Sequence, residues 1–317
     1  MPQRVQWWGS VGLPACMAST EGNNMRTLFK LTVIAGLALA GTATYFFVGG
    51  TASTTQDPTE LVTIKAGEFS HYPAGDFLRN GNPVSPKARV VRFSHDIQIM
   101  KRQVSQAEYA ACVSDGACKK LDKVLREAVA PDLPAVGISW RDAAAYATWY
   151  SARTGQAYRL PTYAEWVYAA GSAYTEELIV DTSDPNDPAQ RWLAEYALET
   201  QRNTVVDETP QVFGSFGASS TGVLDMAGNV WDWTDTCHSR QYVDQDGGEV
   251  MPSGENCGVR VAAGKHRSYI SDFIRDPKGG ACSVGVPPSN LGFRLVRDAA
   301  GKGAKAEPNL RSRLAIS

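Results

Sequence analysis

The chain has 317 residues, of which 43% are hydrophobic and 20% charged, and its formal net charge is −2. These values are typical of a globular protein with one large domain or two small ones. The small net charge and the lack of a basic stripe argue against nucleic acid as a partner. Eight tryptophans and 29 glycines favour a loop-rich domain over a helical bundle.

The first sixty residues are interpreted as a leader, a targeting segment and a linker. Residues 1–24 have no interpretable pattern, and Met25 is the better start for an exported chain because its charged leader then has ordinary length. Residues 31–48 form an uncharged apolar run of eighteen residues, at the threshold for spanning a bilayer. Positive charge before this run places the remainder outside the cytoplasm. For residues 25–50, a cleaved signal peptide and a membrane anchor both fit; residues 51–60 are a polar linker.

Strand-like patterns begin the main part of the chain. Residues 61–69 and 90–100 alternate as strands do, and a polar loop over residues 75–89 is expected between them. Ser105 is followed three residues later by Glu108. This spacing is a capping box, which predicts the start of a short helix.

Two further helices are predicted downstream. Ser139 and Asp142 repeat the capping spacing, and the apolar stripe that follows ends at Gly155. Pro161 is expected early in the next helix. We interpret Arg159 and Glu165, which flank this helix start, as a structural ion pair, because such pairs more often support a scaffold than a reaction.

The cysteines predict disulfides if the chain is exported. Cys112 and Cys118 flank an Asp-Gly turn and form a disulfide candidate, the alternative being two free buried thiols. A second bridge is expected between Cys237 and Cys257, which leaves Cys282 reduced. A buried thiol at Cys257, or its approach to Cys282 on folding, is the alternative.

Residues 222–235 read GVLDMAGNVWDWTD and form the most distinctive stretch. Trp231 and Trp233 alternate with Asp232, which predicts a short strand with one apolar face after a tight turn. Asp225 and Asp232 flank a loop of backbone carbonyls, a set that suits a hard cation such as calcium. Core tryptophans beside two surface carboxylates are the alternative.

This stretch resembles a signature of the formylglycine-generating enzyme, or sulfatase-modifying factor, family. Two further motifs carry the same resemblance and follow the family order: YRLPTYAEW at residues 158–166 and SNLGFR at residues 289–294. The resemblance covers residues 61–298 and implies an α+β, loop-rich mixed fold of the C-type-lectin-like kind. Residues 299–317 are expected to be a disordered basic tail.

The resemblance also implies site residues. A structural calcium ion is expected, held by the side chains of Asp225 and Asp232 and the carbonyls of Gly228 and Val230; Asp232 stands where the family usually has glutamate. The residues expected to have structural roles are Arg159, Glu165, Trp231, Trp233, Asn290 and Arg294.

Members that oxidise a sulfatase cysteine bind copper(I) through two cysteines, which in some of them flank a His-Arg-Ser-Tyr segment. Here that segment lies at residues 266–269, but the flanking positions are Lys265 and Ile270. Copper is therefore not expected, since neither side chain is a soft ligand.

Two classes of function follow. The first is an exported accessory protein without the copper pair that assists a periplasmic metalloenzyme. The second is a copper or non-haem iron oxidase or tailoring enzyme with a non-standard site. A non-haem iron site needs two histidines and a carboxylate on one face. The four histidines of this chain (His71, His95, His238 and His266) do not have the spacing of metal ligands.

The partner is expected from a finer resemblance. The loop between Cys112 and Cys118, the His-Arg-Ser-Tyr segment and SDFIRD at residues 271–276 resemble the family branch that accompanies copper nitrite reductases in denitrifying bacteria. The expected partner is therefore a periplasmic protein such as nitrite reductase. The expected location is the periplasm, with attachment to the inner membrane if the N-terminal segment is retained.

Overall fold

The computed structural model describes residues 59–121, 130–174, 209–226, 228–277 and 290–298, and four positions between 189 and 197. All of them belong to a compact unit that starts at Ala52. The predicted leader, targeting segment, basic tail and Cys282, together with most of the linker, lie outside the described residues. Among the described residues, no helix has the length and apolar character needed to cross a membrane.

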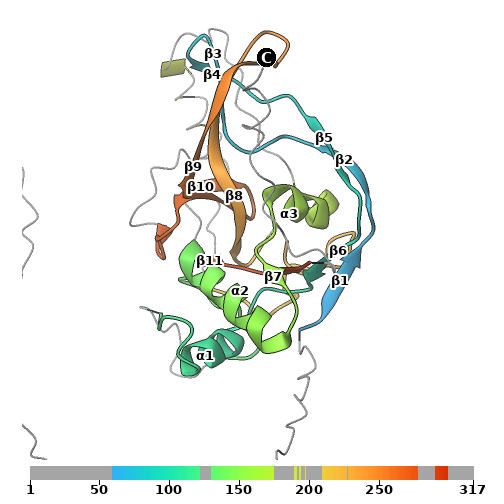
Figure 1. Ribbon diagram of the computed structural model, residues 1–317, viewed down its shortest axis with the longest axis vertical. Coiled ribbons are helices and arrows are strands. Elements are labelled where there is room, and N and C mark those ends of the chain that lie inside the picture. The colour runs from blue at the N-terminus through green and yellow to red at the C-terminus, as the bar shows by residue number, and fades with distance from the viewer. Residues whose placement is uncertain are drawn as a thin grey trace, which may run out of the picture. The chain divides into compact units, whose positions relative to one another are not determined.

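The described part is an α+β arrangement of short helices and three sheets, which confirms the predicted fold class (Figure 1). A four-stranded sheet has the order β1-β6-β12-β7, a second sheet has the order β10-β9-β8-β3-β4 with β11 paired to β8, and β2 pairs with β5. The first sheet comprises β1 (Leu61–Ile64), β6 (Ile97–Met100), β7 (Tyr158–Arg159) and β12 (Val296–Arg297). The second comprises β3 (Asp76–Arg79), β4 (Asn82–Pro83), β8 (Trp231–Val243), β9 (Glu249–Ala263), β10 (Arg267–Ser271) and β11 (Leu291–Gly292). The separate pair is β2 (Gly67–His71) and β5 (Arg89–Phe93).

Each of the three α-helices whose bounds the structure describes begins at a capping box. The helices are α1 (Gln106–Ser114), α2 (Trp140–Thr154) and α3 (Tyr163–Ala170), and a 3₁₀ turn (Gly171–Ala173) follows α3. Their N-caps are Ser105, Ser139 and Thr162, whose hydroxyls each accept a backbone amide three residues on. The predicted starts of α1 and α2 are confirmed, and α2 ends at Gly155 with φ 69° as expected.

The four-stranded sheet separates two apolar clusters. Met100 and Leu295 belong to the first cluster, which includes the buried faces of α1 and α2. Ile99 and Val296, their neighbours in sequence, belong to the second cluster, which includes the buried face of α3. Because successive strand residues point to opposite sides, one short sheet contributes to both clusters.

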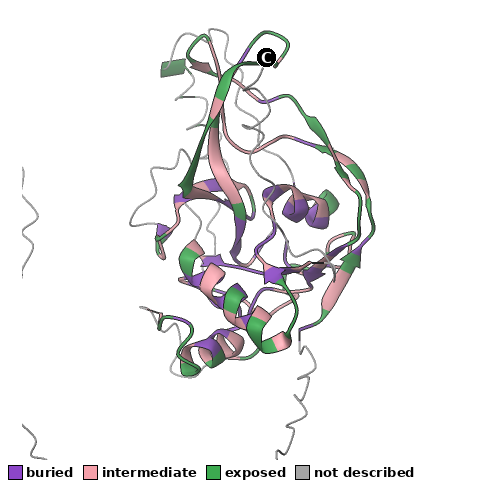
Figure 2. Cartoon of the chain, in the orientation of Figure 1, coloured by how far each residue is buried: buried purple, intermediate pink, exposed green. Residues whose placement is uncertain are grey.

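Three expectations about the strands were wrong in extent. The predicted strands over residues 61–69 and 90–100 are each divided into two, and the predicted polar loop at 75–89 contains β3 and β4. The chain after Arg240 forms the outer part of the β8–β9 ribbon, whose β9 face is largely exposed (Figure 2). These strands form by pairing between distant segments, and a local pattern of polar residues does not predict such pairing.

The strand that starts at Trp231 is buried on both faces. Trp231 and Trp233 enter the first cluster, but Asp232 and Thr234 on the other face are also buried. The predicted single apolar face is confirmed, but the opposite, polar face is buried as well. Asp232 is covered because α3 packs against β8 and the Trp166 indole donates to its carboxylate.

Candidate functional site

The positions at which the resemblance places copper-binding cysteines lie at the two ends of the His-Arg-Ser-Tyr segment. Lys265 is exposed in the turn between β9 and β10, where the Gly264 amide donates to the His266 carbonyl at 3.1 Å. Ile270 lies opposite Arg260 of β9, and its side chain is 1% exposed within the first cluster. An exposed ammonium and a core isoleucine supply no ligand for a soft metal ion.

The His-Arg-Ser-Tyr segment holds the chain that follows β2. Arg267 donates from Nη1 to the Pro73 carbonyl at 3.2 Å. The Tyr269 hydroxyl accepts the Gly75 amide at 2.6 Å. Gly75 has φ 132°, and a Cβ there would lie 2.4 Å from Ser239 Oγ, so glycine is required. These polar side chains contact the protein's own loop.

Arg159 and Glu165 form a two-point ion pair at the start of α3. Arg159 Nη2 donates to Glu165 Oε1 at 2.7 Å, and Nη1 donates to Oε2 at 2.8 Å. Arg159 Nε also donates to Asp298 at 3.0 Å, and the Thr162 amide donates to Glu165 at 2.7 Å. Burial alone would raise the pKa of the Glu165 carboxyl, but Arg159 and the Thr162 donors hold it below its ordinary value. The pair joins the first sheet to α3.

Asp232 lies in a fully buried polar cluster with Arg294. Arg294 Nε donates to Asp232 Oδ2 at 2.6 Å, and the Trp166 indole donates to the same oxygen at 2.9 Å. Burial raises the pKa of the Asp232 carboxyl, against the opposing effect of Arg294. Asp232 Oδ1 and both side-chain amide atoms of Gln103 are buried without a hydrogen-bond partner in the described part of the chain.

Asp225 organises the loop before β8. Its two carboxylate oxygens accept the amides of Gly214 and Phe216 at 2.7 and 2.8 Å. Its backbone has φ 55°, a left-handed value that few residues other than glycine, asparagine and aspartate adopt. Both predicted calcium carboxylates thus have donors within the protein.

Two carboxylates and two backbone carbonyls are oxygen donors of the kind that a hard cation takes. Asp232 Oδ1 is the carboxylate oxygen of this set that accepts no amide or guanidinium hydrogen bond among the described residues. The Asp225, Asp232, Gly228 and Val230 oxygens remain the predicted ligands, and calcium stays a prediction.

Both predicted disulfides are present. Cys112 and Cys118 are bridged with their Cα atoms 5.3 Å apart, and Cys237 and Cys257 are bridged with a Cα separation of 4.5 Å. The first bridge lies in the first cluster, whereas Cys257 is exposed on β9. No described cysteine is therefore a free thiol.

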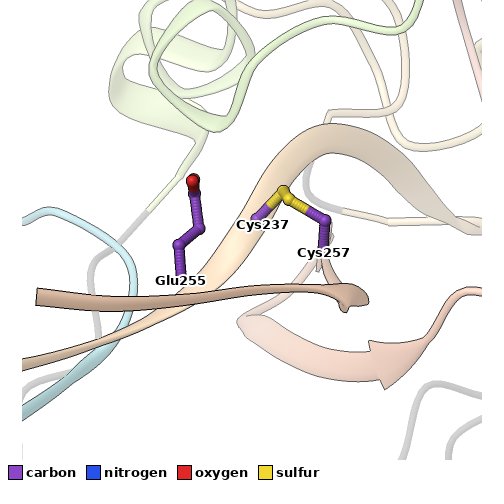
Figure 3. Close-up of side chains that lie close together, drawn as sticks. All are labelled: Cys237, Glu255 and Cys257. Carbon is purple, nitrogen blue, oxygen red and sulfur yellow. A yellow bond between two sulfur atoms is a disulfide. The ribbon is translucent and has the colours of Figure 1, made fainter. Parts of the chain in front are cut away.

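Cys237, Cys257 and Glu255 form the single group of three or more side chains with metal-ligand atoms that the described residues bring together. Figure 3 shows the Glu255 side chain and the disulfide on the same side of the ribbon. Sequence reasoning missed Glu255, although its spacing of two residues from Cys257 on a strand was the available signal.

Other predicted residues have protein partners. His238 Nε2 lies 3.2 Å from Asp76, and His266 packs edge-on against Trp231. Trp140 is half-buried, and the Arg260 guanidinium stacks 3.9 Å from its ring centroid. Asn290 is also half-buried, and its carbonyl accepts the Trp231 amide at 2.9 Å.

Fold and site together define an α+β domain in which arginine–carboxylate pairs and aromatic side chains surround a tryptophan-containing strand. The chain belongs to the sulfatase-modifying factor enzyme 1-like domain family, whose sequence pattern matches residues 49–299.

The chain is similar in sequence to formylglycine-generating enzymes and to part of a protein kinase. The chain is 32% identical over 183 residues to the formylglycine-generating enzyme of Streptomyces coelicolor, which covers 53% of this chain and 54% of that protein. It is 27% identical over 262 residues to the serine/threonine-protein kinase Pkn1 of Chlamydia trachomatis, which covers 76% of this chain and 38% of the kinase. The chain thus spans about half the length, or less, of these relatives. The structure of PvdO from Pseudomonas aeruginosa aligns with a TM-score of 0.49 and 22% identity, over 78% of this chain and 97% of that one.

Proposed function

We propose that this family member does not generate formylglycine and acts as an exported accessory protein for a periplasmic metalloenzyme such as nitrite reductase. The observation that carries the proposal is the chemistry at the two positions corresponding to the copper cysteines. Lys265 is exposed and charged, and Ile270 is part of the core. The four described cysteines are joined in two disulfides, so none of them supplies a thiolate in this state.

The reaction itself explains why these positions matter. Oxidation of a substrate cysteine by oxygen needs a soft metal ion that binds thiolate, and two protein thiolates supply that binding in the resembled enzymes. A lysine ammonium repels a cation, and an isoleucine has no donor atom. The preserved parts are the ion pair at α3, the Asp232–Arg294 cluster and the loop contacts of Arg267 and Tyr269. Such a scaffold suits binding of a partner segment.

Two features support export. The disulfides at Cys112–Cys118 and Cys237–Cys257 are of the kind that persists in oxidising compartments. The uncharged run over residues 31–48, preceded by Arg26 and Lys30, is the signal expected of an exported chain. The periplasm meets both conditions.

The enzymatic half of the proposal is tested with a cysteine peptide that carries the sulfatase motif. Purified protein is incubated with the peptide, copper and oxygen, and the aldehyde is sought by mass spectrometry beside the formylglycine-generating enzyme of Streptomyces coelicolor. We expect aldehyde from that enzyme and none from this protein. Aldehyde formed with turnover would overturn the proposal and favour the tailoring-enzyme alternative.

The accessory half is tested by deleting the gene in its host. Periplasmic nitrite reductase activity should fall while sulfatase activity is unchanged, and the gene with Lys265→Ala should restore it, because Lys265 has no catalytic part in the proposal. Loss of sulfatase activity, or full nitrite reductase activity in the deletion strain, would contradict it.

We further propose a structural calcium ion held by Asp225, Asp232, Gly228 and Val230. It would neutralise the buried carboxylates and fix the loop before β8. The test compares thermal unfolding with calcium, with magnesium and with a chelator. At about 100 times the dissociation constant, calcium should stabilise the fold by about 2.7 kcal/mol. Equal unfolding temperatures in all three conditions, together with calcium-free protein by elemental analysis, would exclude the ion.

A further inference from the structure

We infer that Cys237, Cys257 and Glu255 form a zinc-type metal site that is closed while the disulfide is intact and opens when the disulfide is reduced. One ligand atom from each residue lies within 4.8 Å of the other two. In this structure the two sulfur atoms are bonded to each other, so they represent the oxidised state and not metal ligands. The inference does not depend on the proposed function.

The register of the ribbon brings the three side chains to one face. Ser239 of β8 lies opposite Glu255 of β9, and Cys237 lies two residues from Ser239. Glu255 and Cys257 are also two residues apart. Residues at this spacing share a face of a strand, so the carboxylate and the sulfurs project together (Figure 3).

The antiparallel register places Cys257 beside Cys237. Ser239 pairs with Glu255 and His238 pairs with Asn256, and the same register continued by one residue sets Cys237 opposite Cys257. Their Cα atoms are 4.5 Å apart. Cys237 also pairs with Arg260, so the ribbon is bulged directly beyond the disulfide, and bulges occur often beside functional sites.

The exposure of the two bridges differs. Cys112 and Cys118 are buried in the first cluster, at 0% and 8% exposure. Cys257 and Glu255 are exposed on β9. Exchange requires direct attack of a thiolate on a sulfur, so an external dithiol reaches the ribbon bridge first.

The chemistry balances with a dithiol as reductant. The dithiol gives two electrons and two protons to the Cys237–Cys257 bond, and its own sulfurs join in a disulfide. Zinc then displaces both thiol protons as the thiolates bind. Two thiolates and one carboxylate are three of the four ligands of tetrahedral zinc, and water completes the set. With Zn–S distances of about 2.3 Å, the sulfurs must separate to about 3.8 Å, a change within the reach of side-chain rotation.

A guanidinium lies beside the site, next to one of the three anionic ligands that would surround the zinc ion. Arg260 Nε donates to the Cys257 carbonyl at 3.0 Å, and its Nη1 lies 3.0 Å from Asp235. The side chain of Arg260 is 12% exposed. Its guanidinium is therefore fixed next to the cysteine that zinc would bind.

The test uses the full chain in both redox states. The protein is treated with dithiothreitol, desalted without oxygen and titrated with zinc against a chromophoric chelator. Differential alkylation with mass spectrometry reports which bridge has opened, and cobalt absorption in the thiolate charge-transfer region gives a spectroscopic readout. We expect about one additional zinc ion per chain after reduction, and Cys112–Cys118 still bridged.

Two variants make the test specific. Glu255→Gln should weaken zinc binding by about tenfold or more, whereas Glu249→Gln, at another exposed glutamate of β9, should not change it. Cys237→Ser/Cys257→Ser should bind no additional zinc after reduction. The inference is wrong if reduction adds no zinc, if the added zinc persists in the serine variant, or if the two glutamine variants bind equally tightly.

Discussion

The N-termini of α3 and α2 each have a hydroxyl N-cap, a carboxylate in the first turn and an arginine that pairs with it. The two helices differ in where in the sequence the arginine lies. At α3, Arg159 precedes the N-cap Thr162 by three residues and Glu165 follows it by three, so one short segment supplies cation, cap and carboxylate. At α2, Ser139 and Asp142 are also three residues apart, but the cation is Arg275. Arg275 Nε and Nη2 donate to Asp142 at 2.7 and 2.8 Å.

The arginine that pairs with the first-turn carboxylate is local in sequence at α3, whereas at α2 it is supplied by the tertiary structure. The start of α1 resembles that of α3, since Arg102, Ser105 and Glu108 have the same spacing and the same two-point pairing at 2.8 Å. A buried carboxylate in the first turn caps the helix but needs a cation to offset its desolvation. When the cation is local, the pair stabilises one strand–helix junction. When it comes from Arg275, the pair also holds the segment after β10 against α2.

The largest effect is expected at Arg275. Replacing Arg275 with Leu leaves the Asp142 carboxylate, whose side chain is 5% exposed, without its cation. Breaking such a pair from one side costs about 3–5 kcal/mol. Urea unfolding followed by tryptophan fluorescence measures the loss. The control is Arg141→Met, which removes an arginine that is 64% exposed and pairs with Asp272, and it should cost about 1 kcal/mol or less. Equal losses in the two variants would show that the buried Arg275–Asp142 pair contributes no more than an exposed pair at the same helix.

A smaller loss is expected when the local cation of α3 is removed. Arg159→Met leaves Glu165, which is 11% exposed, with the Thr162 amide and hydroxyl as donors. Loss of hydrogen bonds between charged groups costs about 1.5–3 kcal/mol. The matched variant Arg102→Met should cost less, because Glu108 is 20% exposed and water replaces part of the lost interaction. Both are measured by urea unfolding, and a larger loss at Arg102 would show that exposure does not rank these pairs.

The pH dependence of stability is a further test of the ion pairs at the three helix starts. The pKa values of Glu108, Asp142 and Glu165 are held below their ordinary values by arginine and backbone donors, against the opposing effect of burial. Their contribution is therefore complete above the unfolded values, about 3.9 for Asp and 4.3 for Glu, and is lost as pH falls through the lower folded values.

In Arg275→Leu, Asp142 no longer has its main charge partner, so its folded pKa should rise. The stability gap between wild type and this variant should consequently be widest near pH 7 and narrow as pH falls below about 4. Unfolding curves at several pH values measure the gap. A gap that is constant with pH would mean that the Arg275 effect is packing alone.

What the sequence determined was local. The capping boxes at Ser105 and Ser139, the glycine end of α2 and the Cys112–Cys118 bridge all follow from residues a few positions apart, whose energetics depend little on the rest of the chain. The family motifs made the α+β fold and the missing copper pair accessible from the sequence as well. The start of α3 was nearly predicted, but Pro161 precedes the cap and lies outside the helix.

The contacts between distant groups follow from the tertiary fold and not from local sequence patterns. Asp142 finds its cation 133 residues away, and Asp232 is buried because Arg294 and Trp166 reach it from other elements. Glu255 joins the Cys237–Cys257 bridge through the register of the two strands. Periodicity reports whether one side chain faces a core, but it carries no information on the partner that the opposite element supplies. The sequence does not show whether a carboxylate will face water or a buried guanidinium. The packing of distant strands and helices determines which of these environments it has.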